Sequence, residues 1–220
     1  LQCVEWFFAQ GCPLVILACN TASAKALRTI QQNDLQRIGP DKRVLGVIRP
    51  STEIVGQFTK SKKVGILATN GTVQSQSYVI EIQKFFPDVE VIQEPCPMWV
   101  PLVENNEYES HGADFFIKKH IHQLLKKDPL IDTILLACTH YPLLLKKITE
   151  YTPVDIKVLT QGDIVANSLA DYLHRHQEIN EQIARDGKLA FYTTDSAEDF
   201  DSHAAVFYGS PLKSKHVDIG

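Results

Sequence analysis

The sequence lacks the features that mark membrane and secreted proteins. No apolar run approaches the ~20 residues needed to cross a bilayer, and no signal peptide is visible at the N-terminus. The five cysteines are an odd number and include no Cys-X-X-Cys pair, which argues against a disulfide framework and against a structural zinc site. Because free thiols persist in reducing compartments, we expect a cytoplasmic protein with no membrane partner.

A strong excess of either charge is also absent. The net charge is -4 over 220 residues, of which 22% are charged and 44% hydrophobic, as in an ordinary globular domain. The short lysine groups fall where we expect ends of elements or solvated helix faces: Lys60, Lys62, Lys63, Lys118, Lys119, Lys126 and Lys127. Without a basic stripe, the sequence gives no reason to expect a nucleic-acid partner.

An aliphatic run that closes on Ala-Cys occurs twice in the chain. Residues 15–21 read Val-Ile-Leu-Ala-Cys-Asn-Thr, and residues 134–140 read Ile-Leu-Leu-Ala-Cys-Thr-His. Each run predicts a strand buried on both faces of a parallel sheet, followed by the start of a helix. Cys19 and Cys138 are therefore expected at the carboxyl ends of strands, where open α/β sheets bind ligands. The helix N-terminus after each thiol should lower its pKa.

The alternation of strands and helices predicts an α/β fold with mostly parallel sheets. Strands are expected over 14–18, 43–48, 63–68, 89–93, 131–137, 156–159, 189–193 and 216–219. Helices are expected over 1–10, 21–32, 51–58, 111–127, 143–151, 164–174 and 197–207, with another ending at 85 and a loop or short helical turn over 99–106. In the helix over 111–127, Phe115, Ile117, Ile121 and Leu124 are predicted to face inward.

The duplicated motif further predicts two similar α/β halves that face each other across a central cleft. We place residues 1–48 and 161–220 in the first half and residues 49–160 in the second. The chain opens on Leu1 inside a helix pattern that has no start signal. We therefore expect a longer parent protein, in which a strand and a helix precede this sequence.

Two matched thiols in one cleft suit acid/base chemistry. A lone cysteine at a strand end is more often a small core residue, and hydrolysis needs only one thiol and a base. Two bases can instead remove a proton from one face of a carbon and return a proton to the other face, while fixed donors stabilise the carbanion. A thiol hydrolase using Cys138 and His140 and a binding protein with idle cysteines remain alternatives.

Four segments carry a resemblance to a known family. They are Leu-Ala-Cys-Asn-Thr-Ala-Ser-Ala at 17–24, Gly-Ile-Leu-Ala-Thr-Asn-Gly-Thr at 65–72, Val-Pro-Leu-Val-Glu at 100–104 and Leu-Ala-Cys-Thr-His-Tyr-Pro at 136–142. In these segments, and over nearly its whole length, the chain resembles the glutamate racemases of the aspartate/glutamate racemase superfamily. It departs from them before Cys19, where their Asp-Ser-Gly and Pro-Tyr-Gly segments do not occur.

The resemblance implies interconversion of L- and D-glutamate without a metal or other cofactor, which supplies D-glutamate for peptidoglycan. It makes Cys19 and Cys138 the acid/base pair, with His140 assisting Cys138 and Glu104 orienting His140. The side chains implied to hold the small-molecule substrate are Asn20, Thr21, Thr69, Thr72, Thr139 and His140. The family also makes a homodimer a reasonable expectation. The nearest alternative is a superfamily racemase acting on aspartate or a related acid.

Overall fold

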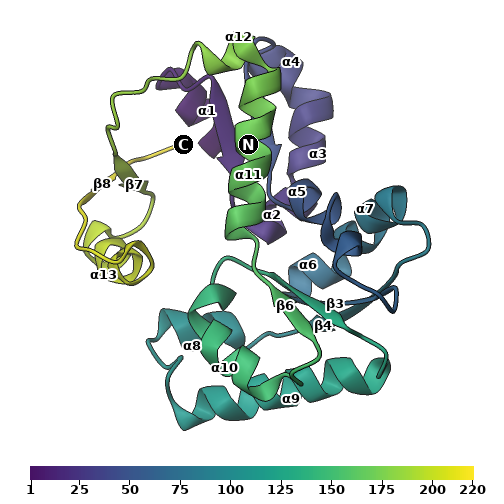
Figure 1. Ribbon diagram of the computed structural model, residues 1–220. Helices are drawn as coiled ribbons and strands as arrows, with labels where there is room; N and C mark the ends of the chain where they lie inside the picture. The colour runs from purple at the N-terminus through teal and green to yellow at the C-terminus, as the bar shows by residue number, and fades with distance from the viewer.

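The computed structural model describes residues 1–220 and contains three separate parallel sheets (Figure 1). The first sheet has the order β1-β2, the second β4-β3-β5-β6 and the third β7-β8. The strand bounds are β1 Leu14–Leu17, β2 Arg43–Gly46, β3 Lys63–Ala68, β4 Glu90–Pro95, β5 Thr133–Ala137, β6 Lys157–Leu159, β7 Phe191–Thr193 and β8 Ser214–His216. Since every pairing is parallel, the predicted α/β class with parallel sheets is confirmed.

The four-stranded sheet forms the main core because helices cover both of its faces. Alternate side chains of a strand point to opposite faces, and neighbouring Leu135 and Leu136 of β5 accordingly belong to different hydrophobic clusters. Leu136 packs with α9 (His111–Lys127) and α10 (Leu145–Tyr151), whereas Leu135 packs with α7 (Ser77–Phe85) and α5 (Ile48–Thr52). This double cover explains the unbroken apolar runs of β3 and β5.

One residue predicted to be inward on α9 points to solvent instead. Ile117, Ile121 and Leu124 are buried, but Phe115 is 63% exposed, so its prediction was wrong. Residues 117, 121 and 124 are separated by four and three positions and share one helix face. A residue two positions before Ile117 lies on the opposite face, because each helical residue turns the chain by about 100°.

Most other predicted elements occur, with shifted bounds. The helix predicted over 21–32 is divided into α2 Asn20–Lys25, α3 Leu27–Thr29, the π-helical segment η1 Ile30–Asp34 and α4 Leu35–Ile38. The helix predicted to begin at Ser51 begins at Ile48, with Pro50 in its first turn. The remaining elements are α1 Gln2–Ala9, η2 Val55–Gln57, α6 Asn70–Gln74, α8 Trp99–Glu104, η3 Tyr141–Leu144, α11 Gly162–Arg175, α12 Gln177–Asn180 and α13 Ala197–Tyr208. No helix is long and apolar enough to span a membrane.

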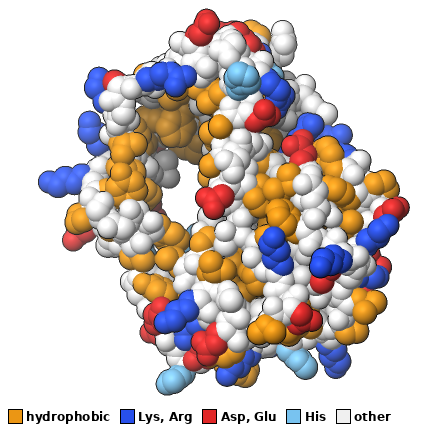
Figure 2. All heavy atoms as spheres, viewed as in Figure 1, with side chains coloured by type: hydrophobic (Ala, Val, Ile, Leu, Met, Phe, Trp, Pro, Cys, Tyr) orange, Lys and Arg blue, Asp and Glu red, His pale blue; other side chains and the backbone are white.

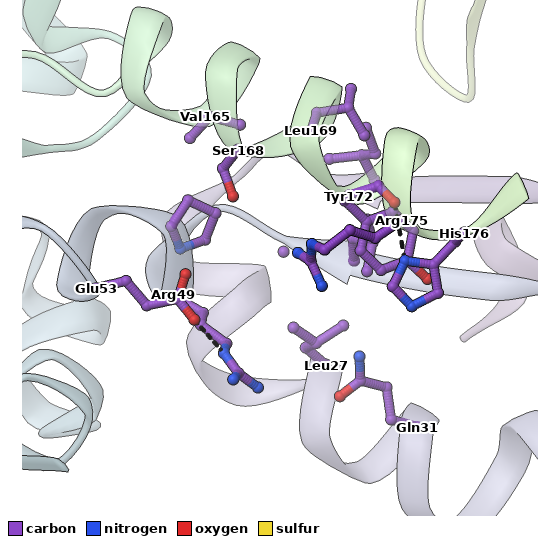
Figure 3. Close-up of a pocket in the computed structure, with 14 residues that line it drawn as sticks. Leu27, Gln31, Arg49, Glu53, Val165, Ser168, Leu169, Tyr172, Arg175 and His176 are labelled. Carbon is purple, nitrogen blue, oxygen red and sulfur yellow. Dashed lines mark hydrogen bonds and ion pairs between the residues drawn. The ribbon is translucent and has the colours of Figure 1, made fainter. Parts of the chain in front are cut away.

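Helix α11 leads from the four-stranded sheet back to the first sheet, yet none of its residues is buried. A cavity of about 380 Å³ separates its apolar face from β1, β2 and α3. Figure 3 shows Leu169 and Tyr172 on α11 across this cavity from Leu27 and Gln31. No residue implied to act in the site lines this cavity.

The C-terminal unit, defined here as β7, α13 and β8, lies beside the first sheet and borders a hollow with hydrophobic side chains on its rim (Figure 2). The Trp6 and Tyr192 rings meet edge to face at 4.9 Å, and the Gln2 side chain donates to the carbonyl of Gly220 at 2.6 Å. The first sheet and the four-stranded sheet fall on either side of residue 48. The division at 48/49 and 160/161 stays a prediction.

Candidate active site

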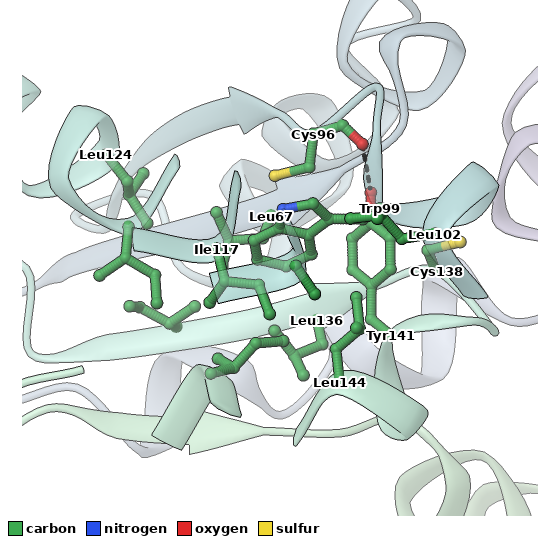
Figure 4. Close-up of a cluster of buried hydrophobic side chains, with 14 of the residues drawn as sticks. Leu67, Cys96, Trp99, Leu102, Ile117, Leu124, Leu136, Cys138, Tyr141 and Leu144 are labelled. Carbon is green, nitrogen blue, oxygen red and sulfur yellow. Dashed lines mark hydrogen bonds between the residues drawn. The ribbon is translucent and has the colours of Figure 1, made fainter. Parts of the chain in front are cut away.

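Cys138 directly follows β5 and is 8% exposed (Figure 4). Trp99, Tyr141 and Leu144 belong to the same hydrophobic cluster as this thiol. Burial disfavours the charged thiolate and raises the pKa of Cys138 to about 11. A hydrogen bond from the His140 backbone opposes this rise, and the negative charges of Cys19 and Glu104 add to it. The lowered pKa expected for Cys138 was therefore wrong, because desolvation outweighs the backbone dipoles.

His140 connects Cys138 to a carboxylate. Its Nδ1 lies 3.9 Å from the Cys138 sulfur and 3.4 Å from the Thr139 hydroxyl oxygen. Its Nε2 lies 3.1 Å from Oε1 of Glu104, the last residue of α8. The two ring nitrogens therefore face different partners, Nε2 the Glu104 carboxylate and Nδ1 the thiol. The structure brings these four side chains together from two segments that are far apart in the sequence.

Cys19 occupies a similar position in the first sheet, two residues after the end of β1. It is the N-cap residue of α2 and is exposed to solvent. Thr21, two residues after Cys19, contacts Thr69, and the preceding Ala68 pairs with Ala137 next to Cys138, so both thiols lie near the same junction between the sheets. The pair therefore combines one accessible thiol with one buried thiol.

Three threonine hydroxyls cluster between the two sheets. Thr21 Oγ1 lies 2.9 Å from Thr69 Oγ1 and 3.2 Å from Thr72 Oγ1, and Thr69 caps α6 by accepting a hydrogen bond from the Thr72 amide. Gly71 permits this approach, because a Cβ there would lie 2.9 Å from the Thr21 methyl carbon. Hydroxyls at this spacing can donate jointly to a carboxylate. No group of three or more His, Cys, Asp or Glu side chains is arranged to hold a metal ion.

Asn20 is 3% exposed and contacts two residues that the sequence analysis did not assign to the site, Tyr78 and Gln161. Gln161 lies two residues after β6, so the rule that selected the cysteines, proximity to the carboxyl end of a parallel strand, could have selected it too. Phe207 was also missed. Its ring packs edge to face on His140 at 5.3 Å.

A cavity of about 500 Å³ lies beside Glu104 and His140. Its remaining wall comes from the C-terminal unit, including Thr193, Asp199 and Phe207. No sequence signal marks these residues, since the contact depends on how the C-terminal unit packs against the second sheet. The cavity gives the His140 side of the candidate site an opening large enough for a small polar molecule.

The raised pKa of Cys138 predicts how its alkylation depends on pH. Only the thiolate reacts with iodoacetamide, so the rate at Cys138 should increase about tenfold per pH unit and level off only near pH 11. Peptide mass mapping after short exposures measures the rate at this residue. In urea-unfolded protein the same thiol should level off near its ordinary pKa of about 8.5. A plateau at or below pH 9 in the folded protein would contradict this account of burial.

Comparison with known proteins agrees with this geometry. The family model for Asp/Glu/Hydantoin racemase matches residues 2–169. The glutamate racemase of Lactiplantibacillus plantarum is 32% identical over 220 residues, which are the whole of this chain and 78% of that protein. The crystal structure of a glutamate racemase isoform from Bacillus anthracis has a TM-score of 0.86 at 29% identity, covering 99% of this chain and 78% of that one.

A second solved structure is similar over the same extent. Glutamate racemase from Francisella tularensis in complex with D-glutamate has a TM-score of 0.83 at 25% identity, covering 99% of this chain and 78% of that one. The matched family region contains both Ala-Cys motifs, the threonine cluster and the His140–Glu104 pair. The chain belongs to the Asp/Glu/Hydantoin racemase family, in which it groups with the glutamate racemases as an amino-acid racemase.

Proposed function

We propose that the protein interconverts L- and D-glutamate by a two-thiol acid/base mechanism in which Cys19 and Cys138 face opposite sides of the α-carbon. The observation that carries this proposal is the placement of the two thiols. Each follows a strand of a different parallel sheet at its carboxyl end, and the contact between Thr21 and Thr69 joins those two ends. The choice of glutamate is supported by relatives that are glutamate racemases, one of them solved with D-glutamate.

In one direction the thiolate of Cys19 removes the α-proton. The Cα–H bond breaks, an S–H bond forms, and the electron pair spreads into the substrate carboxylate. The Cys138 thiol then gives its proton to the opposite face, so that a new Cα–H bond forms and Cys138 is left as the thiolate. Burial keeps Cys138 protonated at neutral pH, which suits it as the donor in this direction. In the reverse direction the two thiols exchange roles.

His140 assists Cys138 in both directions. When Cys138 is the thiolate, the imidazole at 3.9 Å offsets part of the cost of a charge in a buried site. Glu104 accepts from Nε2 at 3.1 Å, which leaves Nδ1 directed at the thiol. The accessible Cys19 has solvent in place of such a partner.

The substrate is held between the two thiols by polar side chains. The clustered hydroxyls of Thr21, Thr69 and Thr72 donate to the α-carboxylate, where negative charge grows as the carbanion forms. Asn20 and Thr139, each next to one cysteine, contact the ammonium and carboxylate groups from the two sides. Donors fixed before the reaction stabilise the transition state without reorganising.

The proposal also covers the use of the product, the cellular compartment and the oligomeric state. D-glutamate formed by this activity would supply peptidoglycan synthesis in the cytoplasm. A homodimer of this chain is part of the same proposal. Neither statement is needed for the chemistry of the two thiols, which the following experiment tests by itself.

Deuterium incorporation at the α-carbon tests the proposed function. Purified protein in D₂O without added cofactor should convert either enantiomer of glutamate to an equal mixture, with deuterium at Cα of the product. Mass spectrometry and chiral chromatography measure both quantities. Aspartate, which is one methylene shorter, serves as the comparison substrate and should turn over far more slowly. Turnover of aspartate alone, or an absence of exchange with glutamate, would overturn the proposal.

A further inference from the structure

Asn20, Tyr78 and Gln161 form a closed ring of hydrogen bonds. The Gln161 amide nitrogen donates to the Tyr78 hydroxyl at 2.8 Å, the Tyr78 hydroxyl donates to Asn20 Oδ1 at 2.5 Å, and Asn20 Nδ2 donates to Gln161 Oε1 at 2.7 Å. Each side chain therefore donates once and accepts once. Asn20 and Tyr78 are 3% and 0% exposed, so water cannot replace these bonds.

The direction of the ring is fixed. The Val47 carbonyl can only accept, which identifies the Gln161 atom beside it as the nitrogen, so the Tyr78 hydroxyl accepts from Gln161 and donates to Asn20. That assignment makes the Asn20 oxygen the acceptor and its nitrogen the donor to Gln161. Because all three bonds run in one sense around the ring, each one polarises the next. The Asn20 amide therefore has a single orientation.

The ring joins three segments that are far apart in the sequence. Asn20 begins α2 after the first sheet, Tyr78 belongs to α7 on the second sheet, and Gln161 lies where the chain passes from β6 to α11. Gln161 is anchored further by the second N–H of its amide nitrogen, which is shared between Ser51 Oγ at 2.7 Å and the Val47 carbonyl at 3.2 Å. One side chain thus ties the α2 end of the site to both sheets.

The ring affects the position of Cys19 more than the position of Cys138. Cys19 is bonded directly to Asn20, is exposed, and has no side-chain hydrogen bond of its own as the α2 cap. Cys138 is held by burial in its hydrophobic cluster and by its contact with His140, and none of the ring's hydrogen bonds reaches it. The position of the accessible thiol therefore depends on the ring, whereas the position of the buried thiol depends on packing.

We propose that Gln161 is a positioning residue that sets the placement of Cys19 for proton transfer by orienting Asn20 through the Asn20–Tyr78–Gln161 ring. This inference rests on the proposed two-thiol function and goes beyond it by assigning a role to a residue outside the four family-like segments. It predicts an asymmetry between the two half-reactions, because only one thiol is placed by the ring.

Single-thiol backgrounds test this asymmetry. In Cys138→Ser protein only Cys19 can exchange the α-proton, and in Cys19→Ser protein only Cys138 can. Adding Gln161→Met, which keeps the side-chain length and removes its polar atoms, should slow deuterium exchange about 10- to 100-fold in the first background. In the second background the change should be less than about threefold. A residue with only a structural role would slow both half-reactions alike.

Two further variants complete the experiment. Tyr78→Phe removes one hydroxyl from the ring and should reproduce the asymmetry of Gln161→Met, including in the case where Gln161→Met fails to fold. Gln57→Met makes the same substitution at an exposed glutamine of η2, outside the ring, and should leave both exchange rates within about twofold. Equal slowing in the two backgrounds, or none in either, would overturn the role of Gln161. Absence of exchange in both single-thiol proteins before any ring substitution would instead count against the two-thiol function.

Discussion

Cys138→Ser is expected to abolish racemisation while leaving α-proton exchange with one enantiomer. A serine hydroxyl at this buried position cannot act as the acid or base, and a lost general acid–base step commonly costs on the order of 10²- to 10⁴-fold in rate. Cys19 still removes the proton from the enantiomer that it faces and returns a deuteron to the same face. Chiral analysis should show no inversion, while mass spectrometry shows deuterium in that one enantiomer.

Cys19→Ser should give the mirror-image result, with exchange confined to the other enantiomer. Cys3→Ser is the matched control, since Cys3 is also an exposed free thiol but lies in α1. The control should racemise glutamate at the unaltered rate. Full racemase activity in either Cys19→Ser or Cys138→Ser would rule out the two-thiol mechanism, and exchange of both enantiomers by one single-thiol variant would rule out its assignment of faces.

Trp99→Ala should cause the largest loss of stability, about 3 to 5 kcal/mol in the free energy of unfolding. The Trp99 side chain is completely buried, packs edge to face on Tyr141 at 4.8 Å and donates to the Phe116 carbonyl at 3.4 Å. Alanine leaves a cavity that the surrounding side chains cannot close. Urea unfolding followed by circular dichroism measures the loss.

Phe115→Ala serves as the control for this prediction. Phe115 is also aromatic but 63% exposed, so its removal should change the free energy of unfolding by less than about 0.5 kcal/mol. If Trp99→Ala is insoluble, Trp99→Leu leaves a smaller cavity and should show a smaller loss in the same direction. Equal stabilities of the Trp99 and Phe115 variants would contradict the burial that the structure assigns to Trp99.

The sequence predicted those elements in which periodicity and burial act together. Strand β3 and helix α9 occupy the residues expected of them, since β3 lies under helices on both faces and α9 has an uninterrupted apolar face. The helix expected over 21–32 occurs, but it is interrupted at Ala26 and continues through a π-helical segment to Ile38, because its apolar residues do not repeat over its whole length. Its π-helical segment Ile30–Asp34 depends on tertiary packing of Ile30 in the small first-sheet core.

The sequence also predicted part of the candidate site, namely those residues that lie in short motifs. The cysteines, threonines, His140 and Glu104 lie in short recognisable segments, and their contacts join segments that are distant in the sequence. Gln161 was missed although it follows a parallel strand, because its contacts are with partners 83 and 141 residues away. The pKa of Cys138 was predicted in the wrong direction, because the depth of burial depends on the assembled core.

Because the two thiols are unequally exposed, the protonation state in which one turnover leaves the proposed enzyme affects the next turnover. After each conversion the free protein carries its proton on the sulfur opposite to the one that carried it before. Before it can accept the same enantiomer again, a proton must leave the accessible Cys19 and another must reach the buried Cys138. Solvent exchanges protons quickly with the sulfur of the exposed Cys19 and slowly with the sulfur of the buried Cys138. At high substrate concentration this resetting step, and not the chemistry at the α-carbon, would then limit the rate of net conversion.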